Sequence, residues 1–141
     1  MRRLAASIAA GAALLAATSA LAQADKEALR REICVEAEAR YVQVFGKPSA
    51  QVGLAVVTMY KHTFCPIEIA VKAGTTVRFV NVDRRTSHSV WFKAAGREES
   101  TRLFGEEHVD MVMDLLPGTH DYLCGPHWEQ EGMIGRIVVR P

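Results

Sequence analysis

Three side chains that metal ions favour lie within ten residues near the end of the chain, in the stretch CGPHWEQEGM. Cys124 offers a thiol, His127 an imidazole and Met133 a thioether. A thiolate with an imidazole selects copper, zinc or iron, whereas carboxylate-rich sites suit magnesium or calcium. A thioether is a poor ligand for zinc and a suitable weak axial ligand for copper. The spacing therefore predicts a metal-binding loop, with copper as the favoured ion.

A copper site of this kind needs a second imidazole, and the sequence offers several candidates. His88 follows a turn-like segment and begins an apolar run, and His120 shares a face with Cys124 if that segment is a strand. His62 and His108 are expected at solvated positions. Spacing alone does not select the second ligand, which stays open at this point.

The N-terminus has the layout of a secretory signal peptide. Two arginines follow Met1, residues 4–17 form an uncharged, alanine-rich run, and small residues offer cleavage after Ala22 or Ala24. The run is shorter and less apolar than the roughly 20 residues of a spanning helix. We expect residues 1–22 to be removed on export to the periplasm, leaving no membrane span.

The mature chain is nearly neutral and one domain in size. Without the two N-terminal arginines, 15 Lys and Arg face 16 Asp and Glu. The absence of a basic block argues against a nucleic-acid partner, and we expect a soluble monomer. The three cysteines are an odd number for an oxidising compartment, so one must be free, intermolecular or chemically employed. They are Cys34, Cys65 and Cys124.

One helix and a series of short strands are predicted to position these residues. Apolar residues from Leu29 to Phe45 recur at three- and four-residue spacing, which indicates an amphipathic helix over residues 25–45. Gly46 and Pro48 predict its end. The later apolar runs alternate between turns, as in a β-sandwich or barrel. They cover residues 52–59, 67–71, 77–79, 90–92, 109–115, 119–123 and 134–139.

Two methionines in the predicted strand at residues 109–115 do not join the metal-binding candidates. Met111 and Met113 alternate with aspartates, which favours core positions. The charged stretch 97–108 shows no regular pattern.

The order of these motifs resembles the cupredoxins, the small type 1 blue copper proteins of the plastocyanin, pseudoazurin and amicyanin kind. Three stretches carry the resemblance: TFCPIEIAVKAGTTVRFVNVDRRTSHSV, LPGTHDYLCGPH and GMIGRIVV. It extends over residues 52–139 and implies an all-β, Greek-key sandwich of seven to eight strands. Residues 50–141 would form this copper-binding domain, and residues 25–48 an added N-terminal helical extension.

The resemblance implies a set of four ligands for one copper ion that cycles between Cu(I) and Cu(II). They are His88, Cys124 and His127, with Met133 as the axial thioether. With Cys124 assigned to copper in this way, Cys34 and Cys65 remain to form a disulfide bond that would hold the helix on the sandwich.

Three departures from the family pattern affect the site. Five residues separate His127 from Met133, more than in plastocyanin or amicyanin, so an oxygen of Glu129, Gln130 or Glu131 is an alternative axial donor. Ser89 stands where the family often has asparagine, and we expect a weaker hydrogen bond between the two ligand loops. His120 stands where the family often has tyrosine.

The implied function is electron transfer rather than catalysis, because protein ligands would fill the coordination positions. By resemblance, His127 lies near the surface and is the electron's exit. Glu129 and Glu131 beside it favour redox partners with basic patches, such as a cytochrome or an oxidoreductase. Two alternatives are a periplasmic copper carrier and a copper-containing accessory subunit that docks through its helix.

Overall fold

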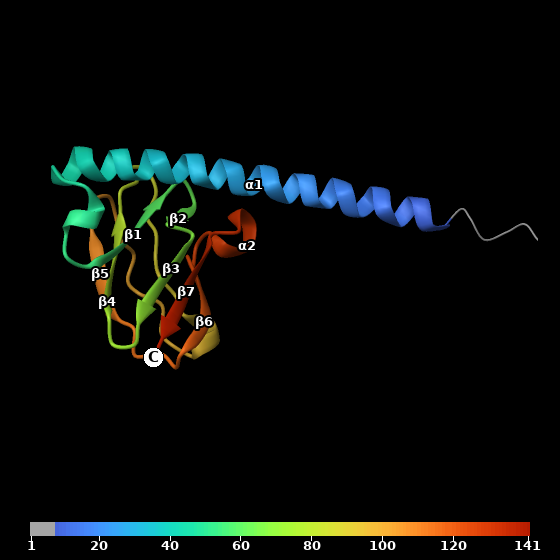
Figure 1. Cartoon of the computed structure of the whole chain (residues 1–141). Coiled ribbons are helices and arrows are strands. Elements are labelled where there is room, and N and C mark those ends of the chain that lie inside the picture. Colours follow the sequence, from blue (N-terminus) through green and yellow to red (C-terminus); the bar gives the residue numbers. More distant parts are fainter. Residues whose placement is uncertain (1–7) are drawn as a thin grey trace, which may run out of the picture. The chain divides into compact units, whose positions relative to one another are not determined.

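The computed structural model describes residues 8–141 of the 141-residue chain, with side chains from Ala17 onward (Figure 1). The start of the predicted signal peptide, residues 1–7, lies outside the described residues. The chain divides into two compact units, and the second, Ile33–Pro141, contains all the strands. Within residues 8–141, no helix is both long and apolar enough to cross a membrane.

Helix α1 (Ile8–Phe45) ends where the sequence predicts and begins earlier. Its alanine-rich first half has high helix propensity, which extends the helix beyond the predicted start at residue 25. At the other end Gly46 has a φ of 75°, and its amide donates a hydrogen bond to the carbonyl of Val42 at 2.8 Å. Glycine adopts this left-handed conformation without a steric penalty and so terminates the helix.

Seven strands form two sheets, which confirms the predicted all-β sandwich with an N-terminal helix. One sheet has the order β2-β1-β4-β5 and the other the order β3-β7-β6. The strands are β1 (Ala55–Tyr60), β2 (Thr63–Cys65), β3 (Glu68–Lys72), β4 (Thr76–Asn81), β5 (His108–Val112), β6 (Gly118–Leu123) and β7 (Ile134–Arg140). Three short helical turns lie between these elements: η1 (Ser49–Gln51) before β1, η2 (Lys93–Ala95) between β4 and β5, and α2 (Trp128–Glu131) between β6 and β7.

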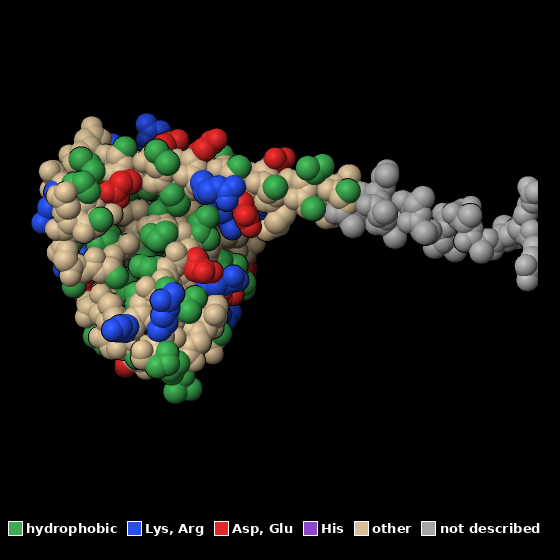
Figure 2. Space-filling view, in the orientation of Figure 1, with side chains coloured by type: hydrophobic (Ala, Val, Ile, Leu, Met, Phe, Trp, Pro, Cys, Tyr) green, Lys and Arg blue, Asp and Glu red, His purple; other side chains and the backbone are tan. Residues whose placement is uncertain are grey.

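The main core lies between the sheets and follows the two-residue periodicity of the strands. Val77 and Phe79 of β4 point into it, and Arg78 between them is paired with Asp110 of β5 at 2.7 Å. Met113 is fully buried in this core and Met111 packs against it, as the sequence predicts. On the face drawn in Figure 2, basic and acidic side chains are interspersed over the described surface.

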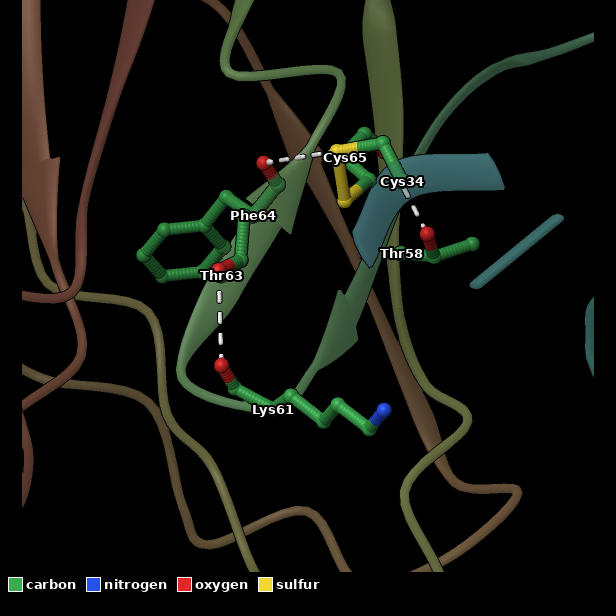
Figure 3. The surroundings of a disulfide bond; sticks show 6 residues. All are labelled: Cys34, Thr58, Lys61, Thr63, Phe64 and Cys65. Atoms are coloured by element: carbon green, nitrogen blue, oxygen red, sulfur yellow. Dashed lines mark hydrogen bonds between the residues drawn. A yellow bond between two sulfur atoms is a disulfide. The ribbon is translucent and has the colours of Figure 1, made fainter. Parts of the chain in front are cut away.

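A second apolar cluster holds the end of α1 on the sandwich. Ala37 and Tyr41 of α1 pack against Val80 and Val82, which point away from the main core. The predicted disulfide is present between Cys34 of α1 and Cys65 at the end of β2 (Figure 3). Residues 33–45 of α1 are therefore fixed to the sheet by a covalent bond and by buried apolar contacts.

Two segments differ from the strands that the sequence predicts. β2 was not predicted, because its three residues are too few to show a periodicity. Residues 90–92, predicted as a strand, make only an isolated bridge from Trp91 to Leu123. His88 just before them bridges to Leu103 instead. Because the segment changes partners between two bridges, it forms no regular ladder.

Gly135 of β7 leaves room for a large core side chain on the paired strand β6. A Cβ atom at this position would lie 2.4 Å from Cζ of Tyr122, whose ring is fully buried against Phe64 and Phe79. Gly135→Ala is therefore expected to lower the free energy of unfolding by about 1–3 kcal/mol, the usual cost of overpacking a core. Urea unfolding measures the difference, and equal midpoints for the two proteins would contradict it.

Candidate metal centre

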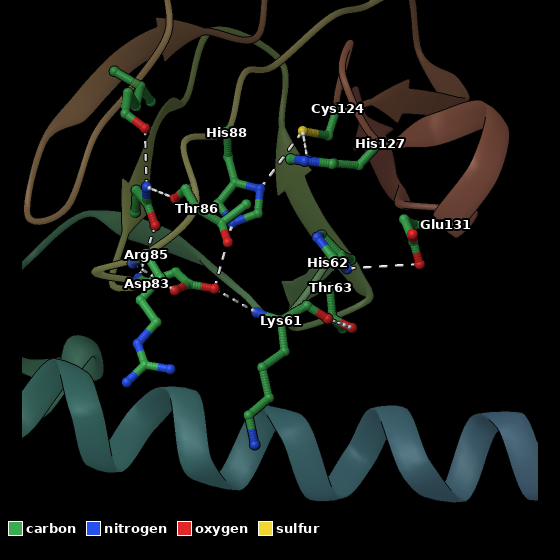
Figure 4. Close-up of polar contacts among 12 residues, drawn as sticks. Lys61, His62, Thr63, Asp83, Arg85, Thr86, His88, Cys124, His127 and Glu131 are labelled. Atoms are coloured by element: carbon green, nitrogen blue, oxygen red, sulfur yellow. Dashed lines mark hydrogen bonds and ion pairs between the residues drawn. The ribbon is translucent and has the colours of Figure 1, made fainter.

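The structure brings together three of the four ligands named from the sequence (Figure 4). The Sγ atom of Cys124 lies 3.6 Å from Nδ1 of His88 and 3.3 Å from Nδ1 of His127. The three ligand atoms all lie within 4.8 Å of one another. His88 comes from the loop after β4, and the other two come from the loop between β6 and α2. Two imidazoles and one thiol thus converge at one end of the sandwich.

Backbone hydrogen bonds shape the loop that carries Cys124, His127 and Met133. The carbonyl of Cys124 accepts from the amides of His127 at 3.0 Å and Trp128 at 2.9 Å. The carbonyl of His127 accepts from the amide of Met133 at 3.2 Å, and the amide of Cys124 donates to the carbonyl of Met133 at 3.1 Å. The first and last residues of the loop are therefore bonded directly to each other.

Ser89 links this loop to the loop that carries His88. Its hydroxyl accepts a hydrogen bond from the amide of Gly125 at 2.9 Å and donates one to a carboxylate oxygen of Glu99 at 2.6 Å. Its amide points at Sγ of Cys124, at 3.5 Å. The serine thus keeps the connection between the ligand loops that the sequence predicts to be weaker.

The loop before His88 is held by two further side chains. The amide nitrogen of the Asn81 side chain donates to the carbonyls of Thr86 at 2.8 Å and Leu103 at 2.9 Å. Its side-chain oxygen accepts from the amide of Asp83. Oδ2 of Asp83 then lies 3.9 Å from Nε2 of His88. Both residues matched the family pattern, but their structural role could not be predicted from the sequence.

The burial of the ligands suits a bound metal ion. His88 and Cys124 are fully buried. Burial lowers the pKa of His88 to about 4, and the neighbouring imidazole of His127 is the second cause. The His88 ring is therefore neutral at pH 7 and offers a lone pair to a metal ion. Burial raises the pKa of the Cys124 thiol, and a cation at this position would favour the thiolate. The donor set therefore fits copper.

Met133 and its rivals for the axial position lie in different environments. Met133 is 1% exposed and belongs to the same core cluster as Cys124. The rival donors on α2 are exposed, and the Glu131 carboxylate lies 3.7 Å from Nδ1 of His62. The rivals are Glu129, Gln130 and Glu131.

The remaining histidines separate into one beside the centre and two away from it. The ring centroid of His62 lies 4.5 Å from that of His127, although its side chain is 36% exposed. His120 is bonded to the carbonyl of Leu116 at 2.7 Å, and His108 is exposed at the start of β5. The sequence predicts a solvated position for His62 and misses its contact with the site. The apolar residues on each side of Lys61-His62 are a signal for the hairpin that places it there.

Comparisons with known proteins agree with this geometry. A family model described as copper binding proteins, plastocyanin/azurin family, matches residues 52–140. Amicyanin-alpha of Methylorubrum extorquens is 32% identical over 93 residues, which are 64% of this chain and 75% of that protein.

Solved structures of amicyanin share the fold. A mutant in the reduced Cu(I) form at pH 4 gives a TM-score of 0.55 at 31% identity, and an oxidized mutant gives 0.54 at 30%. Each comparison covers 64% of this chain and 88% of the other. The family-model match over residues 52–140 includes the ligand loops and the strands of both sheets. The chain therefore belongs to the plastocyanin/azurin family of copper-binding proteins, the cupredoxins, whose members are electron carriers rather than enzymes.

Proposed function

We propose that this protein is a periplasmic type 1 copper protein that passes single electrons between redox protein partners. The observation that carries the proposal is the convergence of two imidazole Nδ1 atoms and one thiol at one end of the sandwich. His88, Cys124 and His127 would hold one copper ion. When bound, that ion would supply a one-electron change between Cu(I) and Cu(II).

The protein's own contribution is to hold these donors still and to exclude water. Main-chain hydrogen bonds close the 124–133 loop, and Ser89 joins it to the loop of His88. Full burial of His88 and Cys124 keeps solvent from one side, while His127 is only partly buried. A fixed donor set suits both oxidation states with little rearrangement, and His127, the partly exposed ligand of the three, is the route to the surface that we propose.

Met133 is the axial ligand that we propose. Its burial in the core beside Cys124 and its backbone bonds to Cys124 and His127 support this assignment. The oxygen donors on α2 would have to leave exposed positions to reach a buried site.

Met133→Leu tests the axial assignment. Leucine keeps an apolar side chain of similar size, so the fold should survive. Loss of the thioether disfavours the cuprous state less than the cupric state, so the reduction potential should rise. For one electron, about 59 mV corresponds to a tenfold change in the redox equilibrium, which voltammetry measures easily. Glu129→Gln is the control and should shift the potential much less, since a solvated carboxylate is screened.

The opposite pattern would contradict the axial assignment. If Met133→Leu leaves the spectrum and potential unchanged while Glu129→Gln, Gln130→Ala or Glu131→Gln shifts them strongly, an oxygen is the axial donor.

Periplasmic location rests on the N-terminal pattern of arginines, apolar run and small residues. We propose cleavage after Ala22 or Ala24. N-terminal sequencing of the protein recovered from the periplasm of an expressing bacterium tests this directly. An uncleaved chain, or retention in the cytoplasm, would contradict it.

Copper loading followed by spectroscopy tests the function. One equivalent of copper should give an intense visible absorption and a spin-resonance spectrum with the narrow hyperfine splitting of a copper–thiolate bond. Titration with a reductant should then consume one electron reversibly, with no loss of copper. Ready transfer of copper to a chelator, without reversible reduction, would instead favour a copper carrier. A physiological oxidoreductase that binds the protein only when α1 is intact would favour an accessory subunit.

A further inference from the structure

A cavity lined mainly by basic side chains opens beside the metal centre and uses none of the proposed ligands. Its volume is about 560 Å³. Four cations and one carboxylate contribute to its walls, together with His62 (Figure 4 shows His62, Lys61, Asp83 and Arg85). The charged residues are Arg40, Lys61, Arg84, Arg85 and Asp83.

The positive charge of this cavity is only partly neutralised. Lys61 pairs with Glu36 at 2.5 Å and Arg84 with Glu106 at 3.7 Å. Arg40 donates to the neutral side chain of Gln43 at 3.0 Å. The guanidinium of Arg85 takes part in none of the ion pairs found among the described side chains.

The one carboxylate that lines the cavity, that of Asp83, accepts hydrogen bonds from the backbone. Asp83 accepts hydrogen bonds from the amides of Lys61 at 3.2 Å and Arg85 at 3.1 Å. These neutral donors leave its negative charge in place, and it offsets only one of the four cations that line the cavity. A cleft in which one sign of charge predominates concentrates oppositely charged groups, so this cavity should attract carboxylates.

Both imidazoles of the metal centre lie close behind the cavity wall. His62 lines the cavity, and its ring centroid is 4.5 Å from that of His127 and 6.2 Å from that of His88. Asp83 also lines the cavity and lies 3.9 Å from Nε2 of His88. One side chain thus separates the cavity from each histidine ligand. Because electron transfer slows steeply with distance, a partner bound here would be well placed.

The turn that presents His62 has an unfavourable backbone. Lys61 and His62 join β1 to β2 with φ values of 45° and 56°. A two-residue hairpin turn of this kind favours Asn-Gly, because side chains are disfavoured at positive φ. Strained backbone of this sort is concentrated at functional sites. Here the strained turn places one cation and one imidazole at the edge of the metal centre.

We propose that this basic cavity is the docking site for the carboxylate-rich face of a redox protein, with His62 between that partner and His127. The inference rests on the proposed function and deepens it by naming the charge of the partner. The cations come from α1, the β1–β2 turn and the loop after β4, and Arg84 and Arg85 are exposed. Cations from three elements, of which Lys61, Arg84 and Arg85 are exposed, suit a protein surface better than one enclosed small anion. The cavity thus favours an acidic partner, whereas Glu129 and Glu131 on α2 favour a basic one.

Electron transfer from an acidic haem protein, reduced cytochrome b5, to the oxidised copper-loaded protein tests the proposal. Stopped-flow rates of the wild type should fall as ionic strength rises. Arg85→Glu should lower the rate about tenfold at low salt, the lower range of electrostatic steering. Arg85→Gln should give an intermediate rate. At high salt the three proteins should converge.

The matched control is Lys72→Glu, which changes the net charge equally. Lys72 pairs in register with Arg140, at the end of β7 opposite to Met133. It should alter the rate by less than about twofold, because its distance allows screening. Equal effects of Arg85→Glu and Lys72→Glu, or a wild-type rate that rises with salt, would overturn the proposal.

A small anionic oxidant, ferricyanide, tests whether the cavity binds small anions or the carboxylates of a protein surface. Ferricyanide should oxidise the reduced wild-type protein, and Arg85→Glu should slow this reaction too. If Arg85→Glu slows ferricyanide but not cytochrome b5, the cavity is a small-anion site and the docking proposal is wrong. Failure of the proposed function looks different: the wild type would then lack the visible copper band and would exchange electrons with neither probe.

Discussion

The Cys124→Ser variant is expected to lose the intense visible absorption of the copper-loaded protein completely, while the β-sandwich remains folded. That absorption requires a thiolate bonded to copper, and Cys124 is the free cysteine of the chain, with its sulfur within 3.6 Å of both imidazoles. Serine is similar in size, and the surrounding core packs mainly through other residues. Absorption spectra after addition of one equivalent of copper, with circular dichroism as the check on folding, measure both effects.

His120→Ala is the control for this experiment. His120 is bonded to Leu116 rather than to the centre, so its loss should leave the visible spectrum unchanged. If Cys124→Ser retained the absorption, the assignment of this thiolate to copper would be wrong. If His120→Ala removed it, the proposed second imidazole would be wrong.

Removal of the disulfide should be the largest change in stability. Cys34 and Cys65 are 31 residues apart in sequence, and a cross-link over such a loop contributes about 3–4 kcal/mol in the loop-entropy model. The double variant Cys34→Ala/Cys65→Ala should lower the free energy of unfolding by about this amount. Ala37 and Tyr41 would still pack on Val80, so the sandwich itself should remain.

Urea unfolding of the copper-free protein measures this difference, and thiol titration gives an independent check. Denatured wild type should show one reactive thiol before reduction and three after it. An unchanged unfolding midpoint in the double variant would contradict the stabilising role. A peptide map joining Cys124 to either other cysteine in the holoprotein would contradict the pairing.

The ligand loop was predictable because its donors are neighbours in the chain. Cys124 and His127 are three residues apart, so residue type and spacing were sufficient to predict that this thiol and imidazole lie together. His88 lies 36 residues before Cys124, and spacing does not show which histidine the fold returns to the site. Only the resemblance to the family selected it from the other candidates.

His62 shows why the rest of the site could not be predicted. Its contact with His127 depends on a two-residue turn with positive φ at both positions, and the sequence there lacks glycine and asparagine. The strand that follows, β2, has only three residues. Tertiary contacts here override local preference, and a pattern of residue types does not encode such contacts.

The predicted strand at residues 90–92 was wrong for a related reason. The alternation of Val90 and Phe92 correctly indicates two buried side chains. Regular pairing also requires one neighbouring strand along the whole segment, and the backbone here bonds first to Leu103 and then to Leu123. The periodicity of a segment indicates which of its side chains are buried, but it does not indicate which strand its backbone pairs with.

The direct hydrogen bond between the two ends of the 124–133 loop makes this loop a self-contained module. The loop leaves the sandwich at Cys124 and returns to it at Met133, and the backbones of these two residues are bonded to each other. Residues added or removed between His127 and Met133 therefore need not disturb the register of β6 and β7. The length of this loop can then vary during evolution, or be altered by design, and so change the ligand geometry at the copper without changing the sandwich. The five residues between His127 and Met133 are one such loop length.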